Sequence, residues 1–308
     1  MRLRIIVFVI TASALFPVGG SMIRERSVDG VSSVRDLGMG GASVTLADDA
    51  SAIFSNPGLM PYISRTCFTF TVDPGPIEAN GDYRGLGAFV LRDSDMEWAI
   101  GVGAKGDMTL DVPRYNDSDV ALAPYNYGDF TASIGGAFSA YETYIGIVAK
   151  GYYTMIDAGE TYWGAALDVG IARSIFLKGL LLGVAVKNLG VYYNNAFFSL
   201  DTKITAGIGF RSEGRFAIGL NLTYALPSTD IDFAIGGEYR VYSFDAKTTA
   251  TNEEYLARGV YVRVGMNRTS PSIGLGIYIW QVRLDYALFT DSYTSIGLNH
   301  SFGLSFLL

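Results

Sequence analysis

Residues 215–224 read RFAIGLNLTY, and this stretch alternates apolar with small or polar side chains. Every second residue from Phe216 to Tyr224 is aliphatic or aromatic. The residues between them are Arg215, Ala217, Gly219, Asn221 and Thr223. Successive side chains of a strand point to opposite faces of a sheet, so a period of two predicts a strand with one apolar face. The same alternation recurs in residues 203–211, 232–240, 259–267 and 281–289.

The polar face of these strands indicates what kind of sheet they form. It holds Gly, Ala, Ser, Asn and scattered Arg and Asp, with few of the Lys, Glu and Thr residues usual on solvated sheets. The other face is aliphatic, with aromatic residues towards the strand ends. Transmembrane barrels turn aliphatic residues to lipid, aromatic girdles to the interfaces and polar residues to the lumen. The pattern favours such a barrel, and a soluble β-protein is the alternative.

The composition of the chain excludes several classes of protein. Only 17% of the 308 residues are charged and 49% are hydrophobic, which excludes intrinsic disorder. The formal net charge of −7 argues against a nucleic-acid partner, because phosphate binding requires a basic face. One Cys and one His leave too few ligands for a disulfide framework or a Cys/His zinc site. The apolar run nearest to a membrane helix, 175–186, is interrupted by Lys178.

The first twenty residues have the order of a secretory signal peptide. Arg2 and Arg4 precede an apolar run from Ile5 to Phe16, and small residues follow up to Gly20. We therefore assign 1–20 as a signal peptide cleaved after Gly20, with an uncleaved anchor as the alternative. No cysteine stands at the cleavage site, which argues against a lipoprotein.

About fourteen strands are predicted between residue 65 and the C-terminus, an even number as in single-chain bacterial barrels. Their predicted first residues are Arg65, Tyr83, Glu97, Asp129, Tyr141, Tyr162, Leu180, Lys203, Arg215, Asp232, Gly259, Ser272, Gln281 and Ser295. Long links at 106–128 and 188–202 alternate with short ones, as extracellular loops alternate with periplasmic turns. The long link at 243–258 falls on the periplasmic side by this parity, so either it holds a helical turn or a strand is miscounted.

The segment before the first predicted strand carries a motif. Residues 31–62 read VSSVRDLGMGGASVTLADDASAIFSNPGLMPY. This segment resembles the N-terminal segment of the FadL/PorV-like outer-membrane proteins, with its R-x-L-G-M-G-G-A core, its A-D-D-A-S-A stretch and its N-P-A-G-L motif. The matching residues include Arg35, Gly38, Gly40, Gly41, Asp48, Asp49, Asn56 and Pro57. The alanine that the family has between Pro57 and Gly58 is missing, which leaves the path after Pro57 open.

This resemblance implies that residues 21–62 fold into the lumen of a barrel formed by residues 63–308, as a plug. The glycines permit a close backbone approach in a narrow lumen. Asp48 and Asp49 either cap a short helix at ASAIF or pair with lumenal arginines. Pro57 biases Asn56 away from helix, so the short helix ends there. Gating by the plug and mere filling of space both remain open.

Two further stretches resemble the same family. Residues 183–190, GVAVKNLG, resemble a G-x-x-V-K-N-L-G strand end, and residues 274–300 resemble the last three strands of the family. The C-terminal residues Ser301 to Leu308 approximate a barrel-assembly signal, although any final strand that alternates phenylalanine and leucine would look the same.

Catalytic chemistry finds little support in the chain. The only histidine, His300, shares the outward parity of Leu298 and Phe302, so a Ser-His-acid site is not expected. Residues 116–119, NDSD, offer oxygen ligands for Ca²⁺, but their spacing is not that of an EF-hand, which favours a solvated loop. A further set of charged residues has lumenal parity: Asp168, Glu238, Arg240, Arg263, Arg283 and Asp285. Because buried charges must be paired, we expect them to pair with one another or with the plug; a substrate role is the alternative.

The sequence thus predicts an all-β, transmembrane antiparallel barrel of about fourteen strands with an N-terminal lumenal plug, located in the outer membrane. We expect no enzyme activity, cofactor or metal. By the resemblance, the protein is a channel for small hydrophobic molecules or, alternatively, a PorV-like accessory barrel of a protein secretion system. The expected partners are outer-membrane lipid, the barrel-assembly machinery and either a hydrophobic ligand or a secreted protein.

Overall fold

The computed structural model describes residues 30–74, 82–93, 95, 97–115, 121–156, 160–175, 179–212, 215–226, 228–244, 258–268, 270–290 and 298–308. The predicted signal peptide and the NDSD loop lie outside these residues.

Strands make up most of the described chain. The alternating stretches pair with their sequence neighbours as antiparallel hairpins. The strands are β1 (Cys67–Asp73), β2 (Asp82–Arg92), β3 (Trp98–Tyr115), β4 (Ala121–Ala140), β5 (Thr143–Ile156), β6 (Glu160–Ser174), β7 (Leu180–Asn194), β8 (Ala196–Ser199), β9 (Thr202–Ser212), β10 (Phe216–Leu226), β11 (Ile231–Ser243), β12 (Gly259–Asn267), β13 (Ser270–Ile279), β14 (Val282–Thr290) and β15 (Leu298–Leu307).

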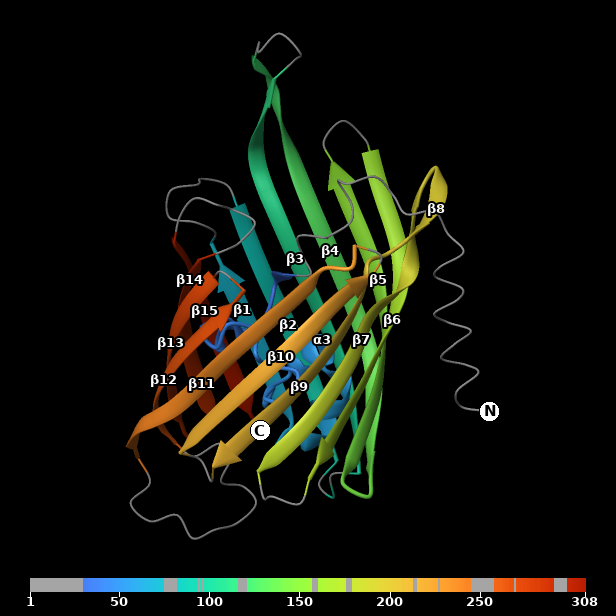
Figure 1. Ribbon diagram of the computed structural model, residues 1–308. Helices are drawn as coiled ribbons and strands as arrows, with labels where there is room; N and C mark the ends of the chain where they lie inside the picture. The colour runs from blue at the N-terminus through green and yellow to red at the C-terminus, as the bar shows by residue number, and fades with distance from the viewer. Residues whose placement is uncertain are drawn as a thin grey trace.

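The strands pair with one another in a continuous, closed sequence. β1 pairs with β15, with Cys67 opposite Leu307, and β7 pairs with both β6 and β9. β8 is a short addition that pairs with the far end of β7. The remaining strands form a closed antiparallel barrel of 14 strands, so the predicted strand number and the all-β fold are confirmed (Figure 1).

Alternating burial distinguishes the two faces of the barrel wall. On β10, Leu220 points outward and is 47% exposed, whereas Asn221 points into the lumen and is 4% exposed. Val264 on β12 is 62% exposed next to Arg263, which is 1% exposed. An outward face that is apolar, on strands whose polar residues point into the lumen, is the arrangement of a membrane barrel.

Two of the predicted long links are wrong. Residues 106–128 are mostly strand, because β3 and β4 continue their pairing through Asp107↔Asp129 and Thr109↔Tyr127 and rise beyond the other strands (Figure 1). In the link predicted at 188–202, β7 runs on to Asn194 and turns back as β8. Alternation weakens in both regions, since strand segments beyond the barrel rim need no continuous apolar face.

The ends of β11 and β12 that are joined by residues 244–258 lie at the end of the barrel that carries the C-terminus, as parity predicts. Ser243 pairs with Gly259, and the pairing continues through Tyr278 and Arg283 to Ser305 near the C-terminus. The count of strands around 243–258 therefore needs no correction. We call this the lower end and the opposite end, where β3 and β4 project, the upper end (Figure 1).

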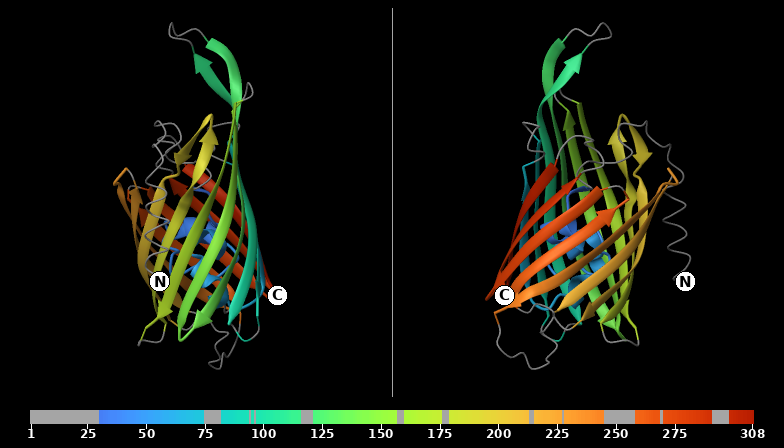
Figure 2. Two further views of the ribbon diagram at one scale, coloured as in Figure 1. Left: turned by 90° about the vertical axis from the view of Figure 1, so that its right-hand side faces the viewer. Right: turned by 60° about the vertical axis from the view of Figure 1, so that its left-hand side comes forward.

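Residues 30–66, which we call the inner segment, lie within the barrel (Figure 2). They form α2 (Val34–Gly38), α3 (Ala52–Ser55) and the 3₁₀ helix η2 (Pro57–Tyr62). α2 contacts β12 to β15, and η2 contacts β2 to β6. Ile53, Leu59 and Met60 are fully buried against Val90 and Ala99 of the wall, so the main hydrophobic core of the protein lies inside the barrel. No helix in the described part of the chain is long and apolar enough to cross a membrane.

Candidate functional site in the barrel lumen

α2 and the turn that follows it lie tightly against the barrel wall. The hydroxyl of Ser33 accepts a hydrogen bond from the Asp36 amide at 3.2 Å and caps α2. After α2 the chain turns at Gly40 and Gly41, whose φ angles are 65° and 86°. A Cβ atom on Gly40 would lie 2.5 Å from the backbone nitrogen of Met266. The positive φ and the close approach together require glycine at this position.

A closed ring of alternating charges lies below this turn. It joins Arg35 to Glu238, Arg263, Asp285, Arg283, Asp48 and back to Arg35. Its six ion pairs measure between 2.6 and 3.5 Å, and no side chain in it is more than 10% exposed. Three guanidinium groups balance three carboxylates, which satisfies the requirement that buried charges be paired.

The ring joins the inner segment to one half of the wall. Arg35 and Asp48 belong to the inner segment, whereas the other four members come from β11, β12 and β14. Arg35 donates two hydrogen bonds to Glu238, at 3.0 and 3.1 Å. Asp49 extends the ring, because it accepts a hydrogen bond from Arg283 and also one from the Ser51 amide at 2.9 Å. Asp48 and Asp49 therefore both pair with a lumenal arginine.

The charges of the ring act on the protonation of its members in the inner segment. Burial alone would raise the pKa of Asp48, but Arg35, Arg283 and Arg211 outweigh it and lower that pKa below 3.8. Burial alone would lower the pKa of Arg35, but Asp48 and Glu238 outweigh it and raise that pKa. Both groups are therefore charged at neutral pH.

Asn56 and Pro57 form a corner against the opposite half of the wall. α3 ends at Ser55 before Asn56, as the sequence predicts. The Asn56 side chain is buried and donates to the carbonyl groups of Val44 and Ile171, at 2.8 and 3.2 Å, while its Oδ1 accepts from the Gly58 amide at 3.0 Å. A Cβ on Gly58 would lie 2.9 Å from the Gly170 carbonyl oxygen, so η2, which begins at Pro57, lies directly against the wall.

Two predicted lumenal charges lie outside the ring. Asp168 on β6 pairs with Lys150 of β5 at 2.8 Å. Arg240 lies towards the lower end of β11, with its side chain beside Gly259. The ring therefore combines four of the six predicted lumenal charges with two predicted residues of the inner segment.

Sequence reasoning missed the role of Asn188. Instead of ending β7, Asn188 forms a bulge with a φ of 63°, where the register of β6 and β7 shifts. Its amide donates to Asp168 at 2.8 Å, and its side-chain oxygen accepts from Tyr152 at 2.7 Å and from Lys150. Asparagine tolerates the left-handed conformation, so the K-N-L-G pattern within a strand was the available signal for a bulge.

A cavity of about 240 Å³ lies above the inner segment. Its floor is formed by α2, the following turn and α3, and its walls come from β2, β3, β7 and β9 to β14. Asn267, Ser270 and Thr290, which line it, stand at the upper ends of β12, β13 and β14. The inner segment therefore separates this cavity from the ring of charges below it.

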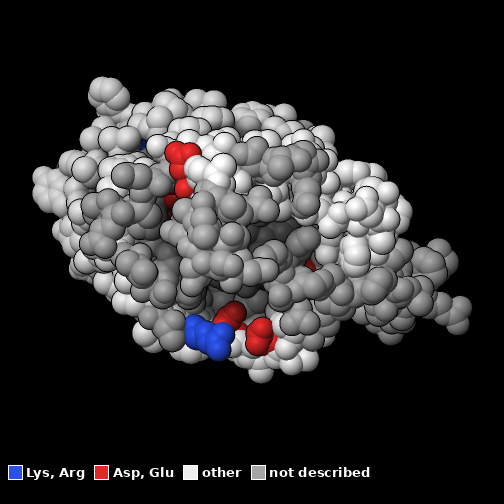
Figure 3. All heavy atoms as spheres, turned by 90° about the horizontal axis from the view of Figure 1, so that it is seen from above, with Lys and Arg blue, Asp and Glu red and all other residues white. Residues whose placement is uncertain are grey.

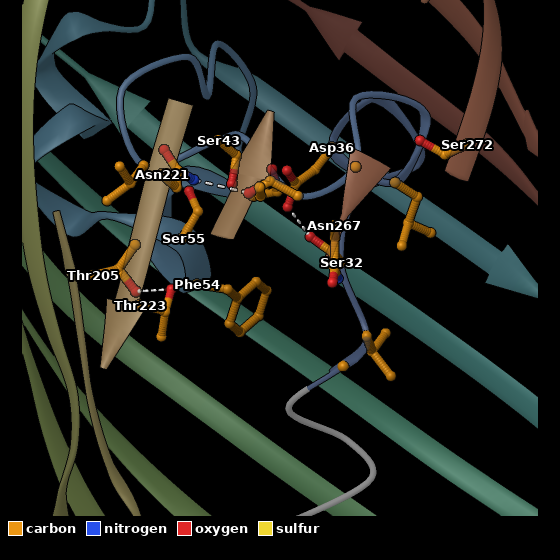
Figure 4. Close-up of a pocket in the computed structure, with 18 of the residues that line it drawn as sticks. Ser32, Asp36, Ser43, Phe54, Ser55, Thr205, Asn221, Thr223, Asn267 and Ser272 are labelled. Atoms are coloured by element: carbon orange, nitrogen blue, oxygen red, sulfur yellow. Dashed lines mark hydrogen bonds between the residues drawn. The ribbon is translucent and has the colours of Figure 1, made fainter. Parts of the chain in front are cut away.

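The lining of this cavity is mostly polar (Figure 4). Its hydroxyl and amide groups come from Ser32, Ser43, Ser51, Ser55, Thr205, Asn221, Thr223, Asn267, Ser270, Ser272 and Thr290. Asp36, Lys105 and Lys187 supply the charges, and Leu37, Phe54, Leu86 and Phe289 supply apolar surface. Seen from above, the described upper surface shows Lys, Arg, Asp and Glu at only a few places (Figure 3).

Within the described residues, no group of three or more His, Cys, Asp and Glu side chains is arranged to hold a metal ion. His300 lies on β15 beside the rings of Tyr286 and Phe302, at 6.5 and 5.6 Å between ring centroids.

Comparison with solved structures identifies similar barrels. The toluene transporter TodX of Pseudomonas putida matches with a TM-score of 0.62 at 10% identity, over 92% of this chain and 99% of TodX. The monoaromatic hydrocarbon channel CymD matches with a TM-score of 0.58 at 11% identity, over 92% of this chain and 99% of CymD. A FadL homologue of Pseudomonas aeruginosa matches with a TM-score of 0.58 at 11% identity, over 89% of this chain and 97% of that homologue. No protein-family profile and no curated protein sequence matches the chain.

Proposed function

We propose that the protein is an outer-membrane channel for small hydrophobic molecules and that its inner segment is the plug of this channel. The observation that carries the proposal is the match of almost the whole barrel to TodX and CymD, a toluene transporter and a hydrocarbon channel. The outward aliphatic side chains support a location in lipid, because about 25 cal/mol per Å² would be lost by exposing them to water.

The ring of charges supports a plug of which one part can move as a unit. Arg35 and Asp48 both join the same ring although they lie thirteen positions apart in the chain. α2 and the turn that follows are thereby tied to one half of the wall, so release of the ring frees a defined part of the plug. A gate needs a contact that is made or broken as a unit, because a structural switch alternates between two arrangements.

The uptake of toluene across a lipopolysaccharide-bearing outer leaflet tests the proposal. Outer-membrane vesicles that contain the protein should accumulate radiolabelled toluene faster than vesicles without it. Arg35→Met removes one cation from the ring and should increase this rate further if the inner segment gates the channel. Arg268→Met is the matched control, because Arg268 pairs with Asp232 at an exposed position of the rim.

The mobility of the unheated protein on a gel shows whether each variant has assembled into a barrel, so that its rate of uptake can be interpreted. An assembled wild-type barrel without accelerated uptake would refute the channel. An assembled Arg35→Met barrel with wild-type uptake would refute gating and leave a static plug. If Arg35→Met fails to assemble, deletion of residues 38–56 replaces it. The secretion-accessory alternative stays a prediction, and no contact described above favours it.

Location in a membrane has its own test. Leu220→Arg places a cation on the outward face and should reduce assembly, because arginine at the bilayer centre of a barrel costs about 2–4 kcal/mol. Asn221→Arg is not a mild control, since Asn221 is buried and donates to the Gly41 carbonyl at 2.9 Å. Ser228→Arg, in the turn after β10, is the suitable control. Equal assembly of the Leu220 and Ser228 variants would contradict the membrane location.

A further inference from the structure

Two lysines bring an excess of positive charge to the cavity above the inner segment. Lys105 of β3 and Lys187 of β7 line it, and Asp36 is the single carboxylate among its described lining residues. Two ammonium groups against one carboxylate leave one positive charge in excess, even when Asp36 is ionised. A cavity with this balance attracts a singly charged anion and repels a cation.

Both ammonium groups lie at the wall of the cavity, around Phe54. Lys187 donates to the Phe54 carbonyl at 3.2 Å, and the Lys105 ammonium lies 5.3 Å from the centre of the Phe54 ring. Lys105 also donates to the Val31 carbonyl at 3.4 Å. Val31 and Phe54 both line the cavity, and Figure 4 shows Phe54 among the residues that surround it. Carbonyl groups accept hydrogen bonds but carry no net charge, so these contacts position the two cations without neutralising them.

Asp36 neutralises only part of this positive charge. Burial raises the pKa of its carboxyl group, and the Ser32 and Ser43 hydroxyls and the charge of Lys187 offset only part of that effect. Ser32 and Ser43 belong to the same inner segment, so the carboxyl group is already bound by its own segment. A raised pKa favours the uncharged acid and can only increase the excess of positive charge in the cavity.

Apolar side chains beside the lysines limit the kind of anion that fits. Leu86 stands opposite Lys105 in the pairing of β2 with β3, and it lines the cavity. Leu37, Phe54 and Phe289 add apolar surface from α2, α3 and β14. An inorganic anion would leave this surface in contact with water, whereas an organic anion covers it with its apolar body. The volume of about 240 Å³ is below the range of roughly 300–1,000 Å³ for drug-sized ligands, so that body has about one ring.

We propose that this cavity is a binding site for small aromatic monocarboxylates, whose carboxylate is held by Lys105 and Lys187 and whose ring contacts the apolar lining. The proposal rests on the channel function above and adds to it a class of substrate, one-ring compounds with a single negative charge. The two lysines are then specificity-determining residues directly above the plug, because they favour anionic permeants over cationic ones of the same shape.

Benzoate, benzamide and benzamidine are matched probes, because each carries one planar group on the same ring and they are anionic, neutral and cationic respectively. Isothermal titration of each into the full-length protein in an uncharged detergent, with protein-free micelles as the blank, measures the preference. Benzoate should bind about tenfold more tightly than benzamide at low salt, because charge-assisted hydrogen bonds are roughly twice as strong as neutral ones. Benzamidine should bind most weakly, and about 1 M salt should reduce the preference for benzoate by screening the charges.

Variants of the two lysines test their role. Lys105→Met and Lys187→Met each remove one charge and should each remove most of the preference for benzoate, with benzamide binding unchanged. Lys187→Arg keeps the charge and should retain the preference. Arg268→Met removes a cation outside the cavity, at the exposed pair with Asp232, and should bind benzoate as the wild-type protein does. If Lys105→Met does not assemble, the two variants of the less buried Lys187 decide the result.

The outcomes separate this site from the channel itself. Equal affinity for benzoate and benzamide, tightest binding of benzamidine, or no binding of any probe would each overturn the aromatic-carboxylate site, whatever the rate of toluene uptake. A preference for benzoate that survives in the lysine-to-methionine variants would overturn it as well. A lysine-dependent preference in a protein that does not accelerate toluene uptake would overturn the channel and retain the site.

Discussion

Within the inner segment, α2 and η2 are held by different means against opposite halves of the barrel. α2 and the residues around it meet β11, β12 and β14 through the ring of charges. η2 meets β5 and β6 through close, uncharged backbone contact, where a Cβ on Gly146 would lie 2.4 Å from the Pro57 carbonyl carbon. The α2 contact depends on charge and the η2 contact depends on close packing. Removal of a charge should therefore weaken the α2 contact, and added side-chain volume should weaken the η2 contact.

Arg283→Met should produce the largest loss of stability. Arg283 donates to Asp48, Asp49 and Asp285, so its removal leaves three buried carboxylates with fewer partners. Breaking a buried pair costs about 3–5 kcal/mol. Urea unfolding in detergent micelles measures the loss. Arg268→Met, at an exposed ion pair, should cost at most about 1 kcal/mol, and an equal effect of the two variants would contradict a structural ring.

Gly170→Ala should produce the next largest loss, this time on the η2 side. The added Cβ would lie 2.1 Å from Asn56 Oδ1 and 2.7 Å from Pro57 Cδ. Overpacking of this kind costs about 1–3 kcal/mol. Gly151→Ala on β5 is the control, because its Cβ would meet nothing within 4 Å. A stability equal to that of Gly151→Ala would show that η2 does not pack as tightly as described.

Acid should weaken the charged half more than the uncharged half. The pKa of Asp48 is lowered below 3.8, so its contribution to stability is present above that pH and is lost as the pH falls through the lowered pKa. Arg35 from its own segment, Arg211 from β9, Glu238 from β11 and Arg283 from β14 face this carboxylate. The free energy of unfolding measured from pH 6 to pH 2 should fall less steeply in Asp48→Asn. An identical slope would contradict the expected role of Asp48.

The combination of Arg283→Met with Gly170→Ala should show the smallest effect, a coupling energy below about 0.5 kcal/mol, because the two sites share no partner. A double-mutant cycle in the same unfolding assay measures it. A larger coupling would mean that the two halves of the inner segment are released together, which would merge the two contacts that the comparison separates.

The period of two was sufficient to predict the barrel wall. Residues such as Leu220 and Asn221 reveal their faces locally, because side-chain direction alternates along any strand. The same reasoning failed in β3, β4 and β7 beyond the rim, where pairing continues without a continuous apolar face. The motif residues Asn56 and Pro57 correctly marked the end of α3, since a proline restricts the residue before it.

The sequence by itself determined the all-β barrel and the residues of lumenal parity. Only the tertiary structure decided which of those charges meet. Glu238, Arg263 and Arg283 lie on three strands, and their closure into one ring with Arg35 and Asp48 depends on barrel register and on the path of the inner segment. The cavity around Asp36 is likewise formed by strands far apart in the chain. Alternation is a local property of the backbone, whereas ion pairing and cavity shape depend on distances between strands that no local pattern records.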